Sequence, residues 1–162
     1  VKLVLAMRPD RIVVGEVRGS EAFELTRAAN AGCGFCCTVH ANSARDALNA
    51  VVNAALMAGE NVTEPIVRKI FAATVDFVVH LDRDTVVAAG DGMRRQTMEI
   101  LAVAPALTDD FTTEPIFVRE ALGKPLVWTG QLPSAAVVDR LEAAIGRRFS
   151  LRAICEGSVT PL

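Results

Sequence analysis

A single carboxylate, Glu16, follows a short apolar run at residues 12–14, with only Gly15 between them. The run contains nothing but isoleucine and valine, which predicts a strand of a parallel sheet that is buried on both faces. Open α/β sheets bind ligands at the carboxyl ends of their strands, so this carboxylate would stand where it could orient a water molecule. Taken alone, the pattern favours a structural salt bridge at the end of a strand.

A second candidate, His40, ends the next predicted strand, residues 34–40, and Thr38 lies two positions before it. With that spacing in a strand, the two side chains point to the same face of the sheet. An imidazole there could hydrogen-bond a phosphate oxygen or Glu16, and could change partner when the phosphate leaves. A lone histidine is more often a structural residue, so a functional interpretation depends on the surrounding motif.

The two segments together resemble the ATPases that drive type II and type IV secretion and pilus assembly, and most closely the CpaF-like branch that powers Tad pili. Residues 8–19, RPDRIVVGEVRG, are similar to the Walker B box of that family, and residues 37–44, CTVHANSA, are similar to its histidine box. The resemblance covers roughly residues 1–105 and is specific, because both boxes occur in the right order and at the right spacing.

The resemblance implies an α/β fold, a RecA-like P-loop NTPase with a mainly parallel sheet and helices on both faces. In such enzymes the acid that ends the Walker B strand holds magnesium or orients the attacking water. ATP and Mg²⁺ are therefore the implied cofactors, with Glu16 as the catalytic glutamate and His40 as the sensor of nucleotide state. The residues implied in nucleotide binding are Gly15, Arg18, Thr38 and Arg8.

Other interpretations stay open for the arginines that flank the predicted strand. Arg8 and Arg18 suit contacts to nucleotide phosphates or to a neighbouring subunit. They equally suit ion pairs with acids nearby in the sequence, namely Asp10, Glu16 and Glu21.

The phosphate-binding loop of P-loop enzymes is absent from these residues. No G-x-x-x-x-G-K-[ST] pattern occurs, and Gly123-Lys124-Pro125 does not replace it, because proline follows the lysine and the preceding glycines are missing. Without the amides and lysine of that loop, a bound phosphate loses most of its electrostatic support. We therefore expect a fragment that lacks its N-terminal P-loop portion and does not hydrolyse ATP alone. It would consist of the C-terminal half of an ATPase domain, residues 1–105, and a small appendage, residues 106–162.

Three cysteines shortly before His40 raise the question of a zinc or redox site. Cys33 and Cys36 form a C-x₂-C pair, followed by Cys37. A closed zinc site needs four ligands, and no second such pair or well-spaced histidine pair occurs. A thioredoxin-like pair should open a helix, whereas this one enters a predicted strand. We expect buried small hydrophobic residues here and no metal site.

The composition gives no electrostatic reason to expect nucleic acid or an anionic membrane as a ligand, since the net charge is −2. No apolar run is long enough to span a bilayer, so no direct membrane insertion is expected. The resemblance implies a homo-oligomer, a hexameric ring on the cytoplasmic face of the inner membrane, that drives a membrane platform protein for pilus assembly or protein export. Two alternatives remain: a non-catalytic interaction remnant of such an ATPase, and a Cys/His metal-binding module.

The elements that would position these residues alternate between strand and helix in the first half of the chain, which predicts a parallel sheet. Ser20 is expected to cap one helix, which Gly32 closes, and Asn42 or Ser43 is expected to cap the next. Further helices are predicted over residues 63–71 and 134–145. The remaining strands are predicted at residues 77–81, at 96–101 near an edge of the sheet, at 116–118 and at 126–128, with a mobile hairpin loop at 82–93.

Overall fold

The computed structural model of the protein describes every residue outside 1–3, 5, 60–62, 84–94, 108–109 and 160–162. Unit 1 comprises Val1–Val75 and Pro105–Thr112, and unit 2 comprises Asp76–Ala104 and Thr113–Leu162. The division at residue 105 between an ATPase half and an appendage stays a prediction, because compactness does not test where the domain of a family ends.

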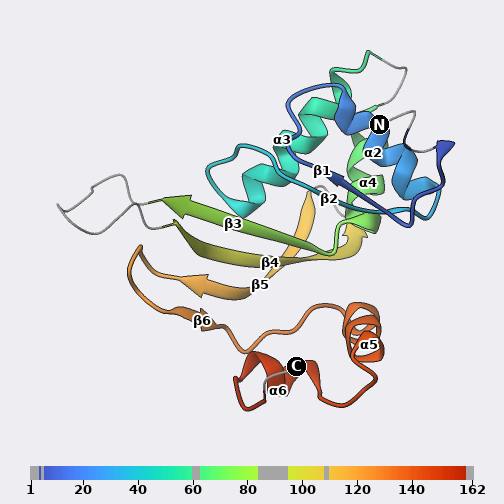
Figure 1. The fold of residues 1–162 in the computed structure, drawn as a ribbon. Coiled ribbons are helices and arrows are strands. Elements are labelled where there is room, and N and C mark those ends of the chain that lie inside the picture. The colour runs from blue at the N-terminus through green and yellow to red at the C-terminus, as the bar shows by residue number, and fades with distance from the viewer. Residues whose placement is uncertain (1–3, 5, 60–62, 84–94, 108–109, 160–162) are drawn as a thin grey trace. The chain divides into compact units, whose positions relative to one another are not determined.

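In unit 1, a two-stranded parallel sheet is accompanied by helices α2, α3 and α4, which lie beside one another (Figure 1). Helix α2 contacts α3, α4 and strand β2. In the sheet, Ile12 stands opposite Phe35 and Val13 stands opposite Cys36. The elements are β1 (Arg11–Val14), α2 (Glu21–Asn30), β2 (Gly34–Cys37), α3 (Ala44–Leu56) and α4 (Glu64–Thr74).

Local signals in the sequence explain where these helices begin and end. Ser43 Oγ accepts a hydrogen bond from the Asp46 amide at 3.0 Å, so Ser43 rather than Asn42 caps α3. Gly32, with φ of 75°, adopts the left-handed conformation that closes α2. Pro65 occupies the first turn of α4, where its missing amide donor costs nothing. The predicted helices of unit 1 are therefore confirmed, but Ser20 makes no side-chain capping hydrogen bond at the start of α2, so the prediction of its capping role is wrong.

The two faces of the β1–β2 sheet differ, which corrects the expectation of a strand buried on both sides. Ile12 is 5% exposed and packs with Ala28 and Cys33. Val13, which points to the other face, is 79% exposed, and its partner Cys36 is exposed as well. Within the described residues of unit 1, helices thus cover only the face on which Ile12 lies. An unbroken apolar run in the sequence predicts a strand that is buried on both faces, but it does not show whether these residues supply elements to cover both.

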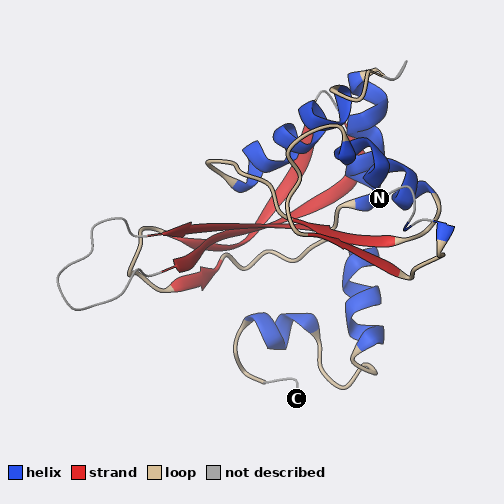
Figure 2. Cartoon of the chain, turned by 45° about the horizontal axis from the view of Figure 1, so that its top comes forward, coloured by secondary structure: helices blue, strands red, loops and turns tan. Residues whose placement is uncertain are grey.

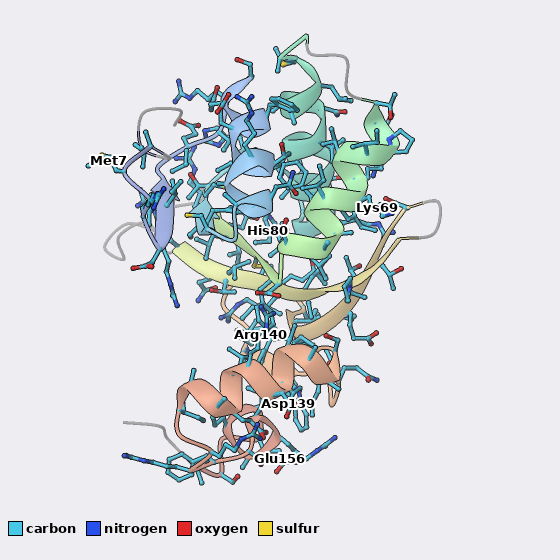
Figure 3. All side chains as sticks on the ribbon, turned by 90° about the vertical axis from the view of Figure 1, so that its right-hand side faces the viewer. Met7, Lys69, His80, Asp139, Arg140 and Glu156 are labelled. Atoms are coloured by element: carbon cyan, nitrogen blue, oxygen red, sulfur yellow. The ribbon has the colours of Figure 1, made fainter. Side chains whose placement is uncertain are left out.

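Unit 2 is built on strands that pair antiparallel, in the order β3-β4-β5-β6 (Figure 2). Two helices follow the sheet, and Arg140, on the side of α5 that faces the sheet, pairs with Asp76 just before β3 (Figure 3). The elements are β3 (Phe77–Arg83), β4 (Arg95–Leu107), β5 (Phe111–Arg119), β6 (Leu126–Trp128), α5 (Ala135–Ala144) and α6 (Leu151–Cys155). The end of β4 and the start of β5 belong to unit 1.

The expectation of a mainly parallel sheet is wrong for strands β3 to β6. Parallel neighbours need a crossover of roughly a dozen residues or more, and the six residues 120–125 between β5 and β6 are too few. The strand predicted at residues 96–101 lies between β3 and β5 rather than at an edge, and it continues through Pro105. The short helix α6 was not predicted. The loop predicted at residues 82–93 lies mostly outside the described residues.

Among the described residues, no helix has the length and apolar character that a bilayer crossing requires.

Candidate functional site

Glu16 and His40 meet at the carboxyl ends of β1 and β2. Because the strands run parallel, the segments that follow them leave the sheet at the same edge. His40 Nε2 lies 2.7 Å from Glu16 Oε1, the distance of an ion pair when the imidazole is protonated. Glu16 Oε1 receives no well-directed hydrogen bond within the described part of the chain, so the His40 contact is one of proximity and charge.

The other oxygen of this carboxylate is held by Arg18. Arg18 Nε donates a hydrogen bond to Glu16 Oε2 at 2.5 Å, and the Nη2 of the same guanidinium lies 2.5 Å from that oxygen. The Arg18 hydrogen bond lowers the pKa of Glu16, the charge of His40 acts in the same direction, and partial burial opposes them. Pairing with Glu16 in turn raises the pKa of Arg18. Glu16 is therefore a carboxylate kept ionised between two groups that carry or can take up positive charge.

The side chains of Glu16, Arg18 and His40 differ in their exposure to solvent. The Glu16 side chain is 25% exposed, whereas Arg18 is 77% exposed and His40 is 93% exposed. The carboxylate is thus set back at the strand end, while its two partners extend into solvent and contact little else. Long or freely rotating exposed groups change partners readily, so both could turn from Glu16 toward a bound anion.

Thr38 joins the two strands just beyond their regular pairing. Its amide donates to the Val14 carbonyl at 3.3 Å, and its carbonyl accepts from the Val17 amide at 2.8 Å. Its hydroxyl donates to the Gly15 carbonyl. Both the backbone and the side chain of Thr38 therefore fix the backbone on either side of Glu16.

The loop that carries Arg18 is held by the first turn of α2. Glu21 Oε1 accepts hydrogen bonds from the Arg18 amide at 2.6 Å and from the Gly19 amide at 3.0 Å. These backbone hydrogen bonds lower the pKa of Glu21. The sequence had suggested Glu21 as a possible ion-pair partner of an arginine, not as an acceptor of backbone hydrogen bonds. Its spacing three residues after Arg18, at the start of a helix, was the signal for this backbone role.

Arg8 lies at the opposite, amino-terminal end of β1. With φ of 52°, it borders a hollow of about 420 Å³ together with Asp10, Gly32 and Cys33. The structure therefore does not bring Arg8 together with Glu16. We call the four residues that it does bring together, Glu16, Arg18, Thr38 and His40, the strand-end cluster.

The residues of the strand-end cluster suit the terminal phosphate of a nucleotide rather than a closed metal cage. Among the described residues, no three His, Cys, Asp or Glu side chains are grouped so as to share a metal ion. Mg²⁺ in nucleotide sites is held by one or two carboxylates, waters and phosphate oxygens, so Glu16 is compatible with it. Gly15 offers its carbonyl to Thr38, and a side chain at Gly15 would meet no atom within 4 Å.

The cysteines behave in two ways. Cys33 is 9% exposed and packs in the core with Ile12, as expected of a small hydrophobic residue. Burial raises the pKa of the Cys37 thiol. Cys36, in contrast, lies exposed beside Val13 on the open face of the sheet, so the prediction of burial is wrong for Cys36.

Three comparisons with known proteins agree with one another. The family model described as "Type II/IV secretion system protein" matches residues 1–103. "Conjugal transfer protein TrbB" of Rhizobium radiobacter is 29% identical over 115 residues, which cover 70% of this chain and 32% of that protein. "Putative conjugal transfer protein Rv3659c" of Mycobacterium tuberculosis is 37% identical over 107 residues, which cover 65% of this chain and 28% of that protein.

A solved structure shows a similar mixed α/β fold. It is the VirB11 ATPase of the Brucella suis type IV secretion system in complex with sulphate, with a TM-score of 0.53 and 26% sequence identity. The match covers 62% of this chain and 30% of that one. The chain spans about a third of the length of the curated relatives that it matches.

Proposed function

The chain belongs to the type II/IV secretion system protein family, and from this premise we propose that it is the part of a secretion ATPase that carries the catalytic glutamate and a phosphate-sensing histidine. The observation that supports the proposal most directly is the contact between Glu16 and His40 at the carboxyl ends of two parallel strands. Two side chains from separate motifs converge there on one point, at the edge of the sheet where α/β proteins bind their ligands.

In this proposal Glu16 orients the water that attacks the terminal phosphate of ATP and accepts its proton, so that ATP and water give ADP and inorganic phosphate. A carboxylate must be ionised for this task, and the pKa of Glu16 is lowered chiefly by Arg18. Phosphate oxygens would compete with Glu16 for Arg18 and His40, which would free the carboxylate for the water. Mg²⁺, when bound, would neutralise charge on the phosphates.

The other parts that an ATPase needs would be supplied by segments of a longer protein outside these 162 residues. No P-loop sequence occurs in the 162 residues, so the phosphate cradle would lie in the rest of a protein as long as the relatives. We infer a RecA-like core completed by that portion, a homo-oligomer of hexameric type, and a place at the cytoplasmic face of the inner membrane against a platform protein. Each of these proposals rests on the family and on the expected motor role.

Two transport processes are candidates for the work done. The resemblance of the two boxes favours assembly of Tad-like pili. The curated relatives carry the names of conjugal transfer proteins, which favours a type IV secretion or conjugation role as a second candidate. Deletion of the gene separates them: loss of surface pili with normal conjugation supports the first, and the reverse supports the second.

The catalytic proposal is tested with Glu16→Gln in a version of the chain extended to the length of its relatives. We expect ATP turnover to fall by about 10²- to 10⁴-fold while ATP binding is retained, because only the proton acceptor is removed. Glu114→Gln, at an exposed position of β5, is the matched control and should leave turnover unchanged. Unchanged turnover in Glu16→Gln contradicts the assignment. An extended protein that binds no ATP supports the non-catalytic alternative instead.

A further inference from the structure

A second set of charged groups, away from the strand-end cluster, gathers around Asp110. Arg45, in the first turn of α3, places Nη2 2.9 Å from Asp110 Oδ2 and 3.1 Å from the Phe111 carbonyl oxygen. Arg68 of α4 places Nη1 3.1 Å from Asp110 Oδ1. One carboxylate thus ties two helices to the start of β5, and all of these residues belong to unit 1.

The Arg68 side of this arrangement is well packed. Its side chain is only 19% exposed and donates to Glu64 Oε1 at 2.7 Å and to Asn49 Oδ1 at 3.0 Å. The guanidinium also lies over the ring of Phe111, 5.4 Å from the centroid, and Phe111 is 2% exposed. Asp110 is held by its own backbone as well, because its Oδ1 accepts from the Phe111 amide at 2.7 Å. The carboxylate therefore has a defined position from which to hold Arg45.

Arg45 is close in the chain to His40. Residues 41–44 separate the two, and Ser43 ends the loop by capping α3. At the other end of the loop, Thr38 is fixed to β1 by its hydrogen bonds. The His40 side chain itself is 93% exposed, so packing does not hold it against Glu16. Its position follows from where the two ends of this short loop are anchored.

We propose that Asp110 is a positioning residue for His40, because it fixes the first turn of α3 through Arg45 so that the loop presents the imidazole to Glu16. The catalytic consequence of this contact rests on the proposed function, whereas the positioning itself does not need nucleotide.

The positioning is tested by proton NMR of the histidine rings in the full chain at one fixed pH. The chain has two histidines, so His80 of β3 serves as an internal reference. Glu16→Gln is expected to shift the ring signals of His40 and to leave those of His80 in place. In an Asp110→Asn background, this response of His40 to Glu16→Gln should fall by at least half. Asp139→Asn, which removes the exposed pair with Arg147 in unit 2, is the matched control and should leave the response intact.

A second variant, Arg45→Gln, tests the same proposal if Asp110→Asn disturbs folding. Arg45→Gln removes the direct pair between Asp110 and the first turn of α3 and leaves Arg68, which pairs with Asp110 and donates to Asn49 further along α3. It should reduce the response of His40 to the same extent, because the first turn is the part of α3 that follows the His40 loop. A full response in Arg45→Gln, with circular dichroism like that of the wild type, overturns the proposal. In the extended protein, Asp110→Asn should lower kcat for ATP with little change in KM. If that protein has no ATPase activity at all, the proposed function fails while the NMR result still decides the positioning.

Discussion

The open face of the β1–β2 sheet leads to a prediction about two neighbouring residues. Parallel sheets are normally buried on both faces, and a two-stranded sheet is seldom stable alone. Yet Val13 is 79% exposed while Ile12 is 5% exposed. We expect the rest of a protein as long as the relatives to cover the face on which Val13 lies.

Threonine substitutions measure this cover, because threonine keeps the β-branch that strands favour. Ile12→Thr removes about two buried carbon groups, at roughly 0.8 kcal/mol each, and buries a hydroxyl at about 1–3 kcal/mol, so the free energy of unfolding should fall by about 2.5–4.5 kcal/mol. Val13→Thr exchanges a methyl for a hydroxyl in solvent, so the free energy of unfolding should change by less than about 0.5 kcal/mol. In the extended protein, the same Val13→Thr substitution should cost about 1–3 kcal/mol.

Equilibrium unfolding in urea, followed by far-ultraviolet circular dichroism, gives these free energies. The single tryptophan, Trp128, lies in unit 2 and does not report on β1, whereas α2, α3 and α4 contribute to the dichroism from unit 1. If Val13→Thr costs as little in the extended protein as in the 162-residue chain, nothing covers this face and the reasoning is refuted. A cost above about 1 kcal/mol in the short chain would show that Val13 is already buried there.

Two further predictions concern the site and its surroundings. The pKa of Glu16 is lowered in the folded chain, so its ionised form stabilises the fold above the unfolded pKa, and this contribution is lost as the pH falls through the lowered folded value. Arg18→Gln should raise the pKa of Glu16, which a carboxyl-carbon NMR titration measures; an unmoved titration would mean that Arg18 does not hold the carboxylate in solution. Cys36 should react with a maleimide in the folded chain, whereas Cys33 should react only after unfolding, as mass spectrometry of labelled peptides detects; equal labelling would contradict the two-faced sheet.

Most elements of unit 1 were predictable because their signals are local. Ser43 caps α3 through a hydrogen bond to an amide only three residues away, and Gly32 closes α2 through its own backbone conformation. In unit 2, β6 and α5 were also found at their predicted places, whereas β5 begins at Phe111, five residues before the strand predicted at residues 116–118. Such signals act within one or two turns of the chain, so neighbouring residues are enough to reveal them.

Sheet topology was not predictable in the same way. Strands and helices follow one another up to β3, and that pattern predicted one parallel sheet, but β4 pairs antiparallel with β3. The choice between these arrangements depends on which distant strand is available as a neighbour. The residues of β3 do not indicate whether its neighbour runs parallel or antiparallel, because both kinds of pairing use the same backbone N–H and C=O groups.

The strand-end cluster was likewise predictable only in part. The sequence by itself determined that Glu16 lies just after an apolar strand, and its two motifs determined the family. The prediction that His40 ends a strand at residues 34–40 was wrong, because β2 ends at Cys37 and His40 lies in the segment that follows it. Only the tertiary structure decided that His40 meets Glu16, that Val13 faces solvent, and that Asp110 reaches Arg45 across 65 positions of the chain. The reason is physical: a motif specifies residue types over a few neighbours, whereas ion pairs and burial depend on segments that meet only when the chain has folded.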